Sequence, residues 1–168
     1  MTTVFTTMDS PLGRLLLSGV VDGDGPLALT AVTAPGQKGA LAEPGDGWLP
    51  DEEALAPAVE QLTAYFAREL TEFDLRLAPE GSAFRQRVWA ALDDVPYGGT
   101  ITYGGLGEAV GLSPRAVRAV GGAVGANPLL IVRPCHRVMG ANGALTGFAA
   151  GVDRKRWLLD HERGATLF

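Results

Sequence analysis

The sequence holds one cysteine and two histidines among 168 residues. A single cysteine excludes an internal disulfide and any zinc site built from several cysteines. No stretch approaches the roughly 20 apolar residues of a membrane-spanning helix. The opening stretch, MTTVFTTMDS, lacks the basic region and apolar run of a signal peptide. We therefore expect a soluble, cytoplasmic protein with no metal and no membrane partner.

Nucleotide-binding motifs are also lacking. The stretch GGLGEAVG at residues 104–111 is rich in glycine, but the glycines do not have the spacing of a dinucleotide fingerprint, and no strand leads directly into them. There is no GxxxxGK phosphate loop either. We expect no cofactor.

Charge is distributed unevenly along the chain. Residues 1–81 hold 4 Lys and Arg against 13 Asp and Glu, whereas residues 82–168 hold 10 against 6. This asymmetry is typical of an acidic scaffold joined to a basic part that binds an anion such as nucleic acid. Two solvated surfaces of different sign would give the same counts, so charge alone leaves both interpretations open.

The first half has the pattern of a small sheet with one helix. Runs of apolar and β-branched residues, separated by Gly, Asp and Pro, predict strands, and apolar residues at helical spacing predict the helix. The predicted strands cover residues 2–8, 13–21, 26–33 and 72–78, and the predicted helix covers residues 53–70. Residues 34–53 have little periodicity and are expected to form a long, mobile surface loop.

The second half is mainly helical. Ser82 is placed to cap a helix over the stretch SAFRQRVWAALDDV. A short helix from Tyr103 to Val110, a turn at Gly111 and a second helix that begins at Pro114 form a helix-turn-helix pattern, with Ser113 as the cap. A plain helical hairpin in a core would have the same pattern.

The second helix of this pair has two different faces. Its inward stripe is expected to consist of Val117, Val120 and Val124. Its other surface carries Arg115 and Arg118 together with the small residues Gly121, Gly122 and Ala123. Small residues would allow a duplex backbone to come close to the helix.

The only cysteine lies in the stretch RPCHRV, residues 133–138. A lone cysteine is more often a small buried hydrophobe than a nucleophile. Here, however, His136 follows it and Arg133 and Arg137 flank it, and a neighbouring base or cation lowers a thiol pKa. Because adjacent side chains of a strand point to opposite sides, Cys135 and His136 can interact only if the backbone bends or through a bridging water.

The stretch DRKRWLLDHERG predicts a closing helix, with Asp153 as its cap and Gly164 as its stop. Leu158 and Glu162 lie four residues apart and therefore share a face. If that face is inward, the carboxylate needs a partner, and His136 is the candidate. A surface glutamate is the alternative.

Four stretches together resemble the O6-alkylguanine-DNA alkyltransferases, also called methylated-DNA–protein-cysteine methyltransferases. They are VPYGGTITYGGL, RAVGGAVGANP, PCHRV and GALTGFAAGVDRKRWLLDHE, in that order. The resemblance is closest over residues 82–168 and extends to the N-terminal half of the chain. It implies an α+β fold with a small N-terminal, ribonuclease-H-like sheet-and-helix domain over residues 1–81. It also implies a mainly helical, winged helix-turn-helix domain over residues 82–168 that carries the cysteine.

The resemblance implies a role for each matching residue. Cys135 would accept the alkyl group once and irreversibly, His136 would take its proton through a water, and Glu162 would hold His136. Tyr103 would donate a proton toward the departing guanine and steer the DNA phosphate. Arg118 would fill the place of the base rotated out of the stack.

Further residues would bind DNA or build the pocket. The expected DNA-binding residues besides Arg118 and Tyr103 are Ser113, Arg115, Gly121, Gly122 and Ala123. The expected pocket and support residues are Asn127, Pro134, Val138, Phe148, Ala149 and Lys155. Four features depart from the family: Phe148 replaces a tyrosine, Arg133 replaces an aliphatic residue, FAAG replaces the usual pair of glycines, and the segment between Tyr103 and Arg118 is one residue longer than in many members.

The expected partner is double-stranded DNA containing O6-alkylguanine, bound by a monomer. The reaction would be direct repair by transfer of the alkyl group to Cys135, after the base has left the duplex. Two alternatives belong to other classes. A lesion-binding protein without transfer would lack the cysteine, and a Cys-His hydrolase would need an oxyanion hole that no motif here suggests.

Overall fold

The computed structural model describes residues 1–41 and 43–164. The chain forms two compact units. The first comprises Met1–Glu80 and Pro128–Val132, and the second comprises Gly81–Asn127 and the described residues from Arg133 onward. The sequence division at residues 81 and 82 had assigned the short segment Pro128–Val132 to the second domain, whereas here it belongs to the first unit.

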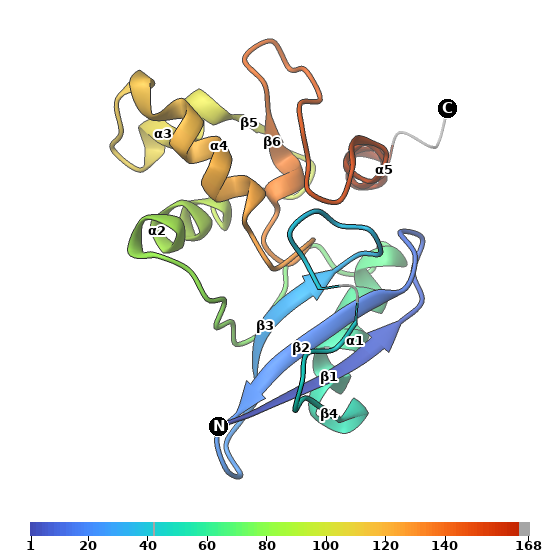
Figure 1. The fold of residues 1–168 in the computed structure, drawn as a ribbon. Coiled ribbons are helices and arrows are strands. Elements are labelled where there is room, and N and C mark those ends of the chain that lie inside the picture. Colours follow the sequence, from blue (N-terminus) through green and yellow to red (C-terminus); the bar gives the residue numbers. More distant parts are fainter. Residues whose placement is uncertain (42, 165–168) are drawn as a thin grey trace. The chain divides into compact units, whose positions relative to one another are not determined.

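A four-stranded sheet forms the first unit (Figure 1). Its strands are β1 (Thr2–Met8), β2 (Leu15–Val21), β3 (Ala28–Thr33) and β4 (Leu49–Pro50), in the order β3-β2-β1-β4. β2 pairs antiparallel with both β1 and β3, and β4 pairs parallel with β1. The first three strands confirm the sequence prediction. β4 lies within residues 34–53, where only a loop was expected.

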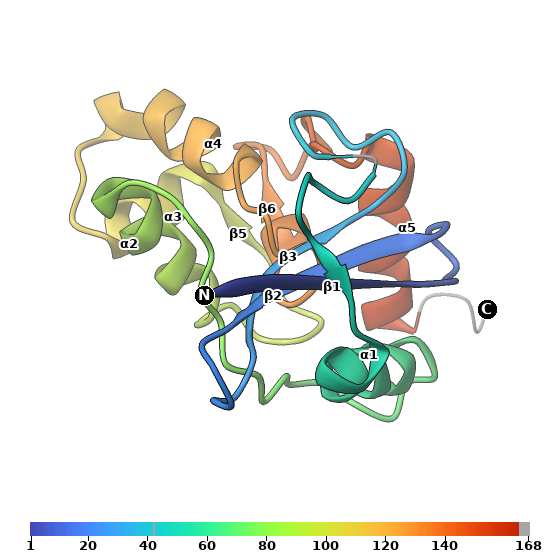
Figure 2. The same ribbon diagram turned by 60° about the horizontal axis from the view of Figure 1, so that its bottom comes forward.

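Helix α1 (Glu52–Phe66) covers one face of this sheet, as Figures 1 and 2 show. The Asp51 side chain accepts a hydrogen bond from the Ala54 amide and so caps the helix. The buried face of α1 consists of Leu55, Ala58, Leu62 and Tyr65. These apolar residues at helical spacing explain why the helix packs on the sheet, and they confirm the predicted helix.

The strand predicted over residues 72–78 is wrong except for one bridge between Leu77 and Leu29. The Gln61 side chain takes the place of strand pairing. Its Oε1 accepts a hydrogen bond from the Asp74 amide (2.8 Å), and its Nε2 donates to the Asp74 carbonyl (2.9 Å). Both backbone groups of Asp74 are thus satisfied without a neighbouring strand.

The second unit holds the helices α2 (Ala83–Leu92), α3 (Tyr103–Ala109), α4 (Val117–Gly125) and α5 (Val152–Arg163). Short 3-10 turns lie at η1 (Pro114–Ala116) and η2 (Cys135–Arg137). The two-residue strands β5 (Ile101–Thr102) and β6 (Val138–Met139) pair in parallel. Ser82 caps α2 as predicted, and α3, η1 and α4 confirm the predicted helix-turn-helix, with Gly111 at φ +79° in the turn.

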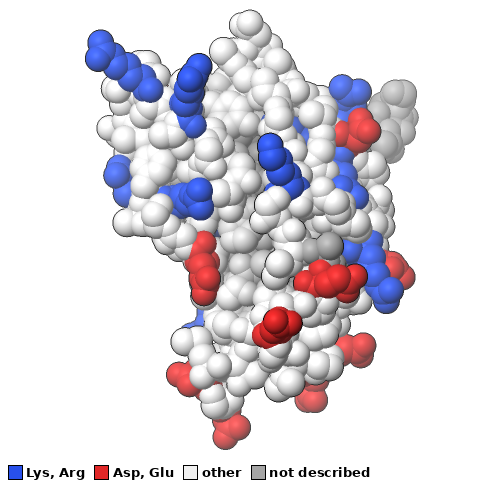
Figure 3. All heavy atoms as spheres, viewed as in Figure 1, with Lys and Arg blue, Asp and Glu red and all other residues white. Residues whose placement is uncertain are grey.

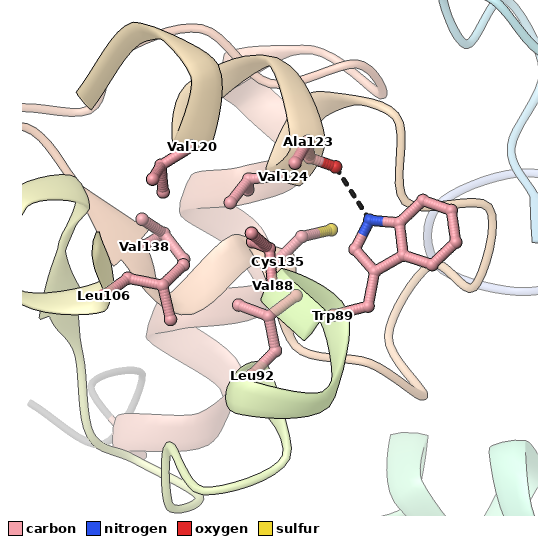
Figure 4. Packing of buried hydrophobic residues seen from close by; sticks show 9 residues of the cluster. All are labelled: Val88, Trp89, Leu92, Leu106, Val120, Ala123, Val124, Cys135 and Val138. Atoms are coloured by element: carbon pink, nitrogen blue, oxygen red, sulfur yellow. Dashed lines mark hydrogen bonds between the residues drawn. The ribbon is translucent and has the colours of Figure 1, made fainter. Parts of the chain in front are cut away.

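One apolar cluster holds α2, α3 and α4 around the cysteine (Figure 4). Its buried members are Val88, Trp89, Leu92, Leu106, Val120, Ala123, Val124, Cys135 and Val138. The Trp89 indole donates a hydrogen bond to the Ala123 carbonyl (2.7 Å), which links α2 to α4. The position of α4 is therefore set by packing and by one directed bond.

Two details of the helices differ from expectation. Val117 is 41% exposed, so the inward stripe of α4 keeps only Val120 and Val124. Val117 is the first residue of α4, directly after the 3-10 turn, and this change of helix type shifts its direction. Helix α5 is capped by Gly151 (φ +95°) rather than by Asp153, while Gly164 ends it in the left-handed conformation, as predicted.

Charge follows the two units. On the face shown in Figure 3, most Asp and Glu lie over the first unit, and most Lys and Arg lie over the second. The uneven distribution of charged residues along the sequence is thus also present on this face of the protein. No helix within residues 1–41 and 43–164 has the length and apolar character needed to cross a membrane.

Candidate active site

The cysteine lies in a sharp bend of the chain. Pro134 has φ −80° and ψ 62°, the Cys135 amide donates to the Arg133 carbonyl (2.7 Å), and the Arg137 amide donates to the Pro134 carbonyl (3.0 Å). This is a tight turn followed by one turn of 3-10 helix rather than a strand. The bend required for Cys135 and His136 to work together is therefore present.

The Asn127 side chain closes this turn from the end of α4. Its Nδ2 donates a hydrogen bond to the Arg133 carbonyl (3.0 Å), and its side chain also hydrogen-bonds the Cys135 thiol. Asn127 is 3% exposed. The expected supporting role of Asn127 thus corresponds to two contacts, one to the backbone of the turn and one to the sulfur.

Cys135 is 5% exposed and lies among Val88, Val124 and Trp89 (Figure 4). Burial raises the pKa of its thiol to about 11, while the Asn127 hydrogen bond and the Lys155 charge oppose this rise. The prediction that Arg133 and Arg137 activate the thiol is wrong, because their guanidinium groups pair with Asp93 and Glu162. The resting thiol is protonated, so attack requires a base.

The residue that follows the cysteine is His136, which is fully buried and contacts α5. Its Nε2 lies 2.6 Å from Glu162 Oε2. Arg137 also binds the same carboxylate, through Nε to Oε1 (2.7 Å) and Nη2 to Oε2 (3.0 Å). Although burial opposes it, these hydrogen bonds hold the pKa of Glu162 well below its usual range. Leu158 and Glu162 both face inward, which confirms the predicted orientation of α5.

These contacts define which nitrogen of His136 can accept a proton. Burial lowers the pKa of His136, so the ring is neutral at pH 7. Since Glu162 is ionised, Nε2 carries the ring proton and donates it to the carboxylate. Nδ1 is then an acceptor, and it is buried without a hydrogen-bond partner. A buried, unpaired basic nitrogen one residue from the thiol is suited to remove its proton.

Lys155 joins the expected pocket residues. Its Nζ is buried and donates to the carbonyls of Val138 (2.6 Å) and Thr146 (3.3 Å). The same nitrogen lies 5.9 Å from the ring centroids of both Tyr103 and Phe148. Burial lowers the pKa of Lys155, and Cys135 opposes that shift. Lys155 therefore contacts two half-buried aromatic rings and the β6 backbone, and its positive charge acts on the Cys135 thiol.

The remaining expected pocket residues lie next to Cys135 in the chain or in the segment before α5. Pro134 is buried directly before Cys135, and Ala149 is half-buried between Phe148 and the buried Ala150. Phe148 packs against the apolar cluster that contains Cys135, as does Tyr103. The substitution of phenylalanine for the family's tyrosine thus keeps a ring at this position.

Most of the expected DNA-binding residues lie on η1, directly before it or on α4, whereas Tyr103 begins α3. Ser113, Arg115, Arg118 and Gly122 are exposed, and a Cβ atom added to Gly122 would meet no atom within 4 Å. A Cβ atom added to Gly121 would lie 4.0 Å from two ring carbons of Tyr103. Ala123 was expected on the DNA-binding surface, and this prediction is wrong, because Ala123 is 3% exposed and packs in the core. Its place one turn after Val120 directs it inward.

The contacts of three residues in this region were not predicted from the sequence. Arg137 was expected to act on the cysteine but instead holds Glu162. Trp89 and Asp93, from α2 and its C-terminal end, hold α4 and Arg133. Helical spacing placed Trp89 in a helix, but neither contact has a signature in a single sequence.

The fold and this site define a protein with a ribonuclease-like unit and a DNA-binding unit that carries a buried thiol. Two family descriptions match the chain. "6-O-methylguanine DNA methyltransferase, ribonuclease-like domain" matches residues 3–79, and "6-O-methylguanine DNA methyltransferase, DNA binding domain" matches residues 83–164. The chain belongs to the 6-O-methylguanine DNA methyltransferase family.

Individual similar proteins match nearly the whole length of this chain. The methylated-DNA–protein-cysteine methyltransferase of Mycolicibacterium paratuberculosis is 51% identical, over 95% of this chain and 92% of its own. That of Methanosarcina acetivorans is 46% identical, over 94% and 97%. The crystal structure of Mycobacterium tuberculosis OGT in complex with DNA has a TM-score of 0.84 and 46% identity, covering 96% of this chain and 93% of that one.

Proposed function

We propose that this protein repairs DNA by transferring an alkyl group from the O6 atom of guanine to its own Cys135. The observation that carries the proposal is the buried thiol next to His136, whose free Nδ1 is set by the contact with Glu162. Membership of the family supports the same reaction.

The transfer forms one bond and breaks one. The Cys135 sulfur attacks the alkyl carbon in line, so that the S–C bond forms while the C–O6 bond breaks. The thiol proton passes to His136 Nδ1, directly or through a water, and the electron pair of the broken bond leaves with guanine. Tyr103 gives its hydroxyl proton to the departing guanine, and the proton held by His136 then returns to Tyr103 through water, so that guanine gains one proton in place of the alkyl group. The thioether is stable, so each molecule acts once.

Charge remains balanced during this step. Arg137 and Glu162 form an ion pair around a neutral His136 before the reaction. When the sulfur loses its proton, the Lys155 charge compensates the thiolate, and Glu162 compensates the imidazolium. The thiolate and the imidazolium that form in this step thus each have an opposite charge nearby, which lowers the barrier in a site removed from water.

Access to O6 requires the nucleotide to leave the duplex, because this atom lies inside the base stack. In this proposal the exposed Arg118 fills the space left behind, and the exposed Arg115 and Ser113 contact phosphates. The bare surface at Gly122 allows the backbone of the duplex to approach α4. The related Mycobacterium tuberculosis OGT, which was crystallised in complex with DNA, supports duplex DNA as the partner.

The test is incubation with duplex DNA that contains one O6-methylguanine, followed by intact mass measurement. We expect a gain of one methyl group, and none in Cys135→Ala. A protein that binds the lesion without reacting would keep its mass, and this result would favour the lesion-binding alternative. An assay with ester substrates addresses the hydrolase alternative, for which repeated turnover would be required.

A further inference from the structure

An ion pair lies at the edge of the site and has no role in the transfer step. Arg133 Nε lies 3.5 Å from Asp93 Oδ1, with the two side chains 13% and 48% exposed. No other carboxylate of the described residues forms an ion pair with this guanidinium. Its Nε and Nη1 are buried without a hydrogen-bond partner. A nearly buried positive charge therefore depends on one half-exposed carboxylate.

The main chain of the same arginine holds the nucleophile. The Arg133 carbonyl accepts hydrogen bonds from Asn127 Nδ2 (3.0 Å) and from the Cys135 amide (2.7 Å). Asn127 in turn hydrogen-bonds the thiol. The Arg133 carbonyl is thus linked to Cys135 in two ways, directly through the Cys135 amide and indirectly through Asn127.

The C-terminal end of α2 and the residues that follow it bind the turn that contains Cys135. Asp93 is the C-cap residue of α2, and the helix residues Val88, Trp89 and Leu92 belong to the same core as Cys135. Just beyond Asp93, the Val95 carbonyl accepts a hydrogen bond from Arg137 Nη1 (2.7 Å). The arginines on both sides of the Pro-Cys-His sequence are therefore attached to residues 93–95.

We infer that Asp93 is a positioning residue for the nucleophile, acting by holding the Arg133 guanidinium at the end of α2. The inference rests on the proposed alkyl transfer. Without the carboxylate, Arg133 would be left as an unpaired charge out of water and would turn toward solvent, taking its carbonyl away from Asn127 and Cys135. Asp93 has this role because the side chain at position 133 carries a positive charge that is nearly buried.

The test compares the rate of methyl transfer at saturating duplex with the dissociation constant for the same duplex. Asp93→Asn should lower the rate about tenfold, as expected for a displaced reacting group, and leave the dissociation constant unchanged. Asp93→Glu keeps the charge and should retain the rate. Asp94→Asn is the matched control, because the neighbouring acid has no ion pair with Arg133.

The double variant is decisive. Arg133→Leu should react at nearly the wild-type rate, and Asp93→Asn combined with Arg133→Leu should recover the rate lost in Asp93→Asn. The same recovery is expected for folding, should Asp93→Asn alone fail to fold. The inference is overturned if Asp93→Asn reacts like the control, if Arg133→Leu does not rescue it, or if the loss lies in DNA binding. Absence of transfer by the wild-type protein would instead contradict the proposed function.

Discussion

His136 Nε2 and Glu162 Oε2 lie 2.6 Å apart, although 26 positions separate the two residues in the chain. This contact connects the turn that bears the nucleophile to helix α5. It places the ring proton of His136 on Nε2 and leaves Nδ1 as the basic atom. The tautomer of His136 is therefore set by its contact with Glu162.

Substitution Glu162→Gln should slow methyl transfer about a hundredfold, which is within the usual range for loss of general base catalysis. A glutamine cannot stabilise the imidazolium that forms when His136 takes the thiol proton. The rate constant for a single turnover with methylated duplex is the measurement. Asp160→Asn, on the same helix, is the control and should react like the wild type.

Stability should fall as the pH decreases below about 6.5. Burial lowers the pKa of His136 from its ordinary value of 6.5, so below that value the unfolded chain binds a proton that the folded chain does not. Glu162 acts in the same direction below its ordinary value of 4.5, because its folded pKa is depressed. Urea unfolding at a series of pH values measures this dependence. In His136→Asn the slope between pH 7 and 5.5 should be smaller, and an unchanged slope would assign it to other groups.

Replacement of Lys155 by methionine should raise the pKa of the Cys135 thiol further. The lysine charge opposes the effect of burial on that thiol, and methionine keeps the length of the side chain without the charge. The rate of alkylation by a small thiol reagent, followed against pH, gives the midpoint. Arg156→Met removes an exposed charge from the same helix and should leave this midpoint in place.

Arg118→Ala should reduce repair of duplex DNA far more than reaction with O6-methylguanine as a free base. The arginine is exposed on α4 and is expected to act only when a nucleotide has left the stack. Parallel rate measurements with the two substrates separate this role from the chemistry. Equal losses on both would mean that Arg118 supports the site itself.

Much of the site could be predicted from the sequence. The spacing of Leu158 and Glu162 predicted that the two residues share a face of α5, and His136 was the candidate partner if that face was inward. The glycine and proline positions between residues 103 and 125 predicted the helix-turn-helix. These features depend on local periodicity and turn chemistry, which a single sequence carries.

Other features depend on contacts between distant residues. The flanking arginines predicted an activated thiol, but Arg133 and Arg137 are held by Asp93 and Glu162, and burial determines the pKa of Cys135. Similarly, the alternation of apolar and polar residues predicted a strand over residues 72–78. In the structure the Gln61 side chain forms hydrogen bonds with the amide and the carbonyl of Asp74 instead. Neither the partner of a charged side chain nor the loss of water around a thiol is visible in sequence spacing.

The central claim is that Cys135 is the acceptor and reacts once. The most direct measurement is titration of the protein with methylated duplex, followed by mass analysis of its peptides. We predict that transfer stops at one methyl group per protein molecule and that the group is found on Cys135 alone. Transfer that continues beyond one equivalent, or a methyl group on another residue, would contradict the account.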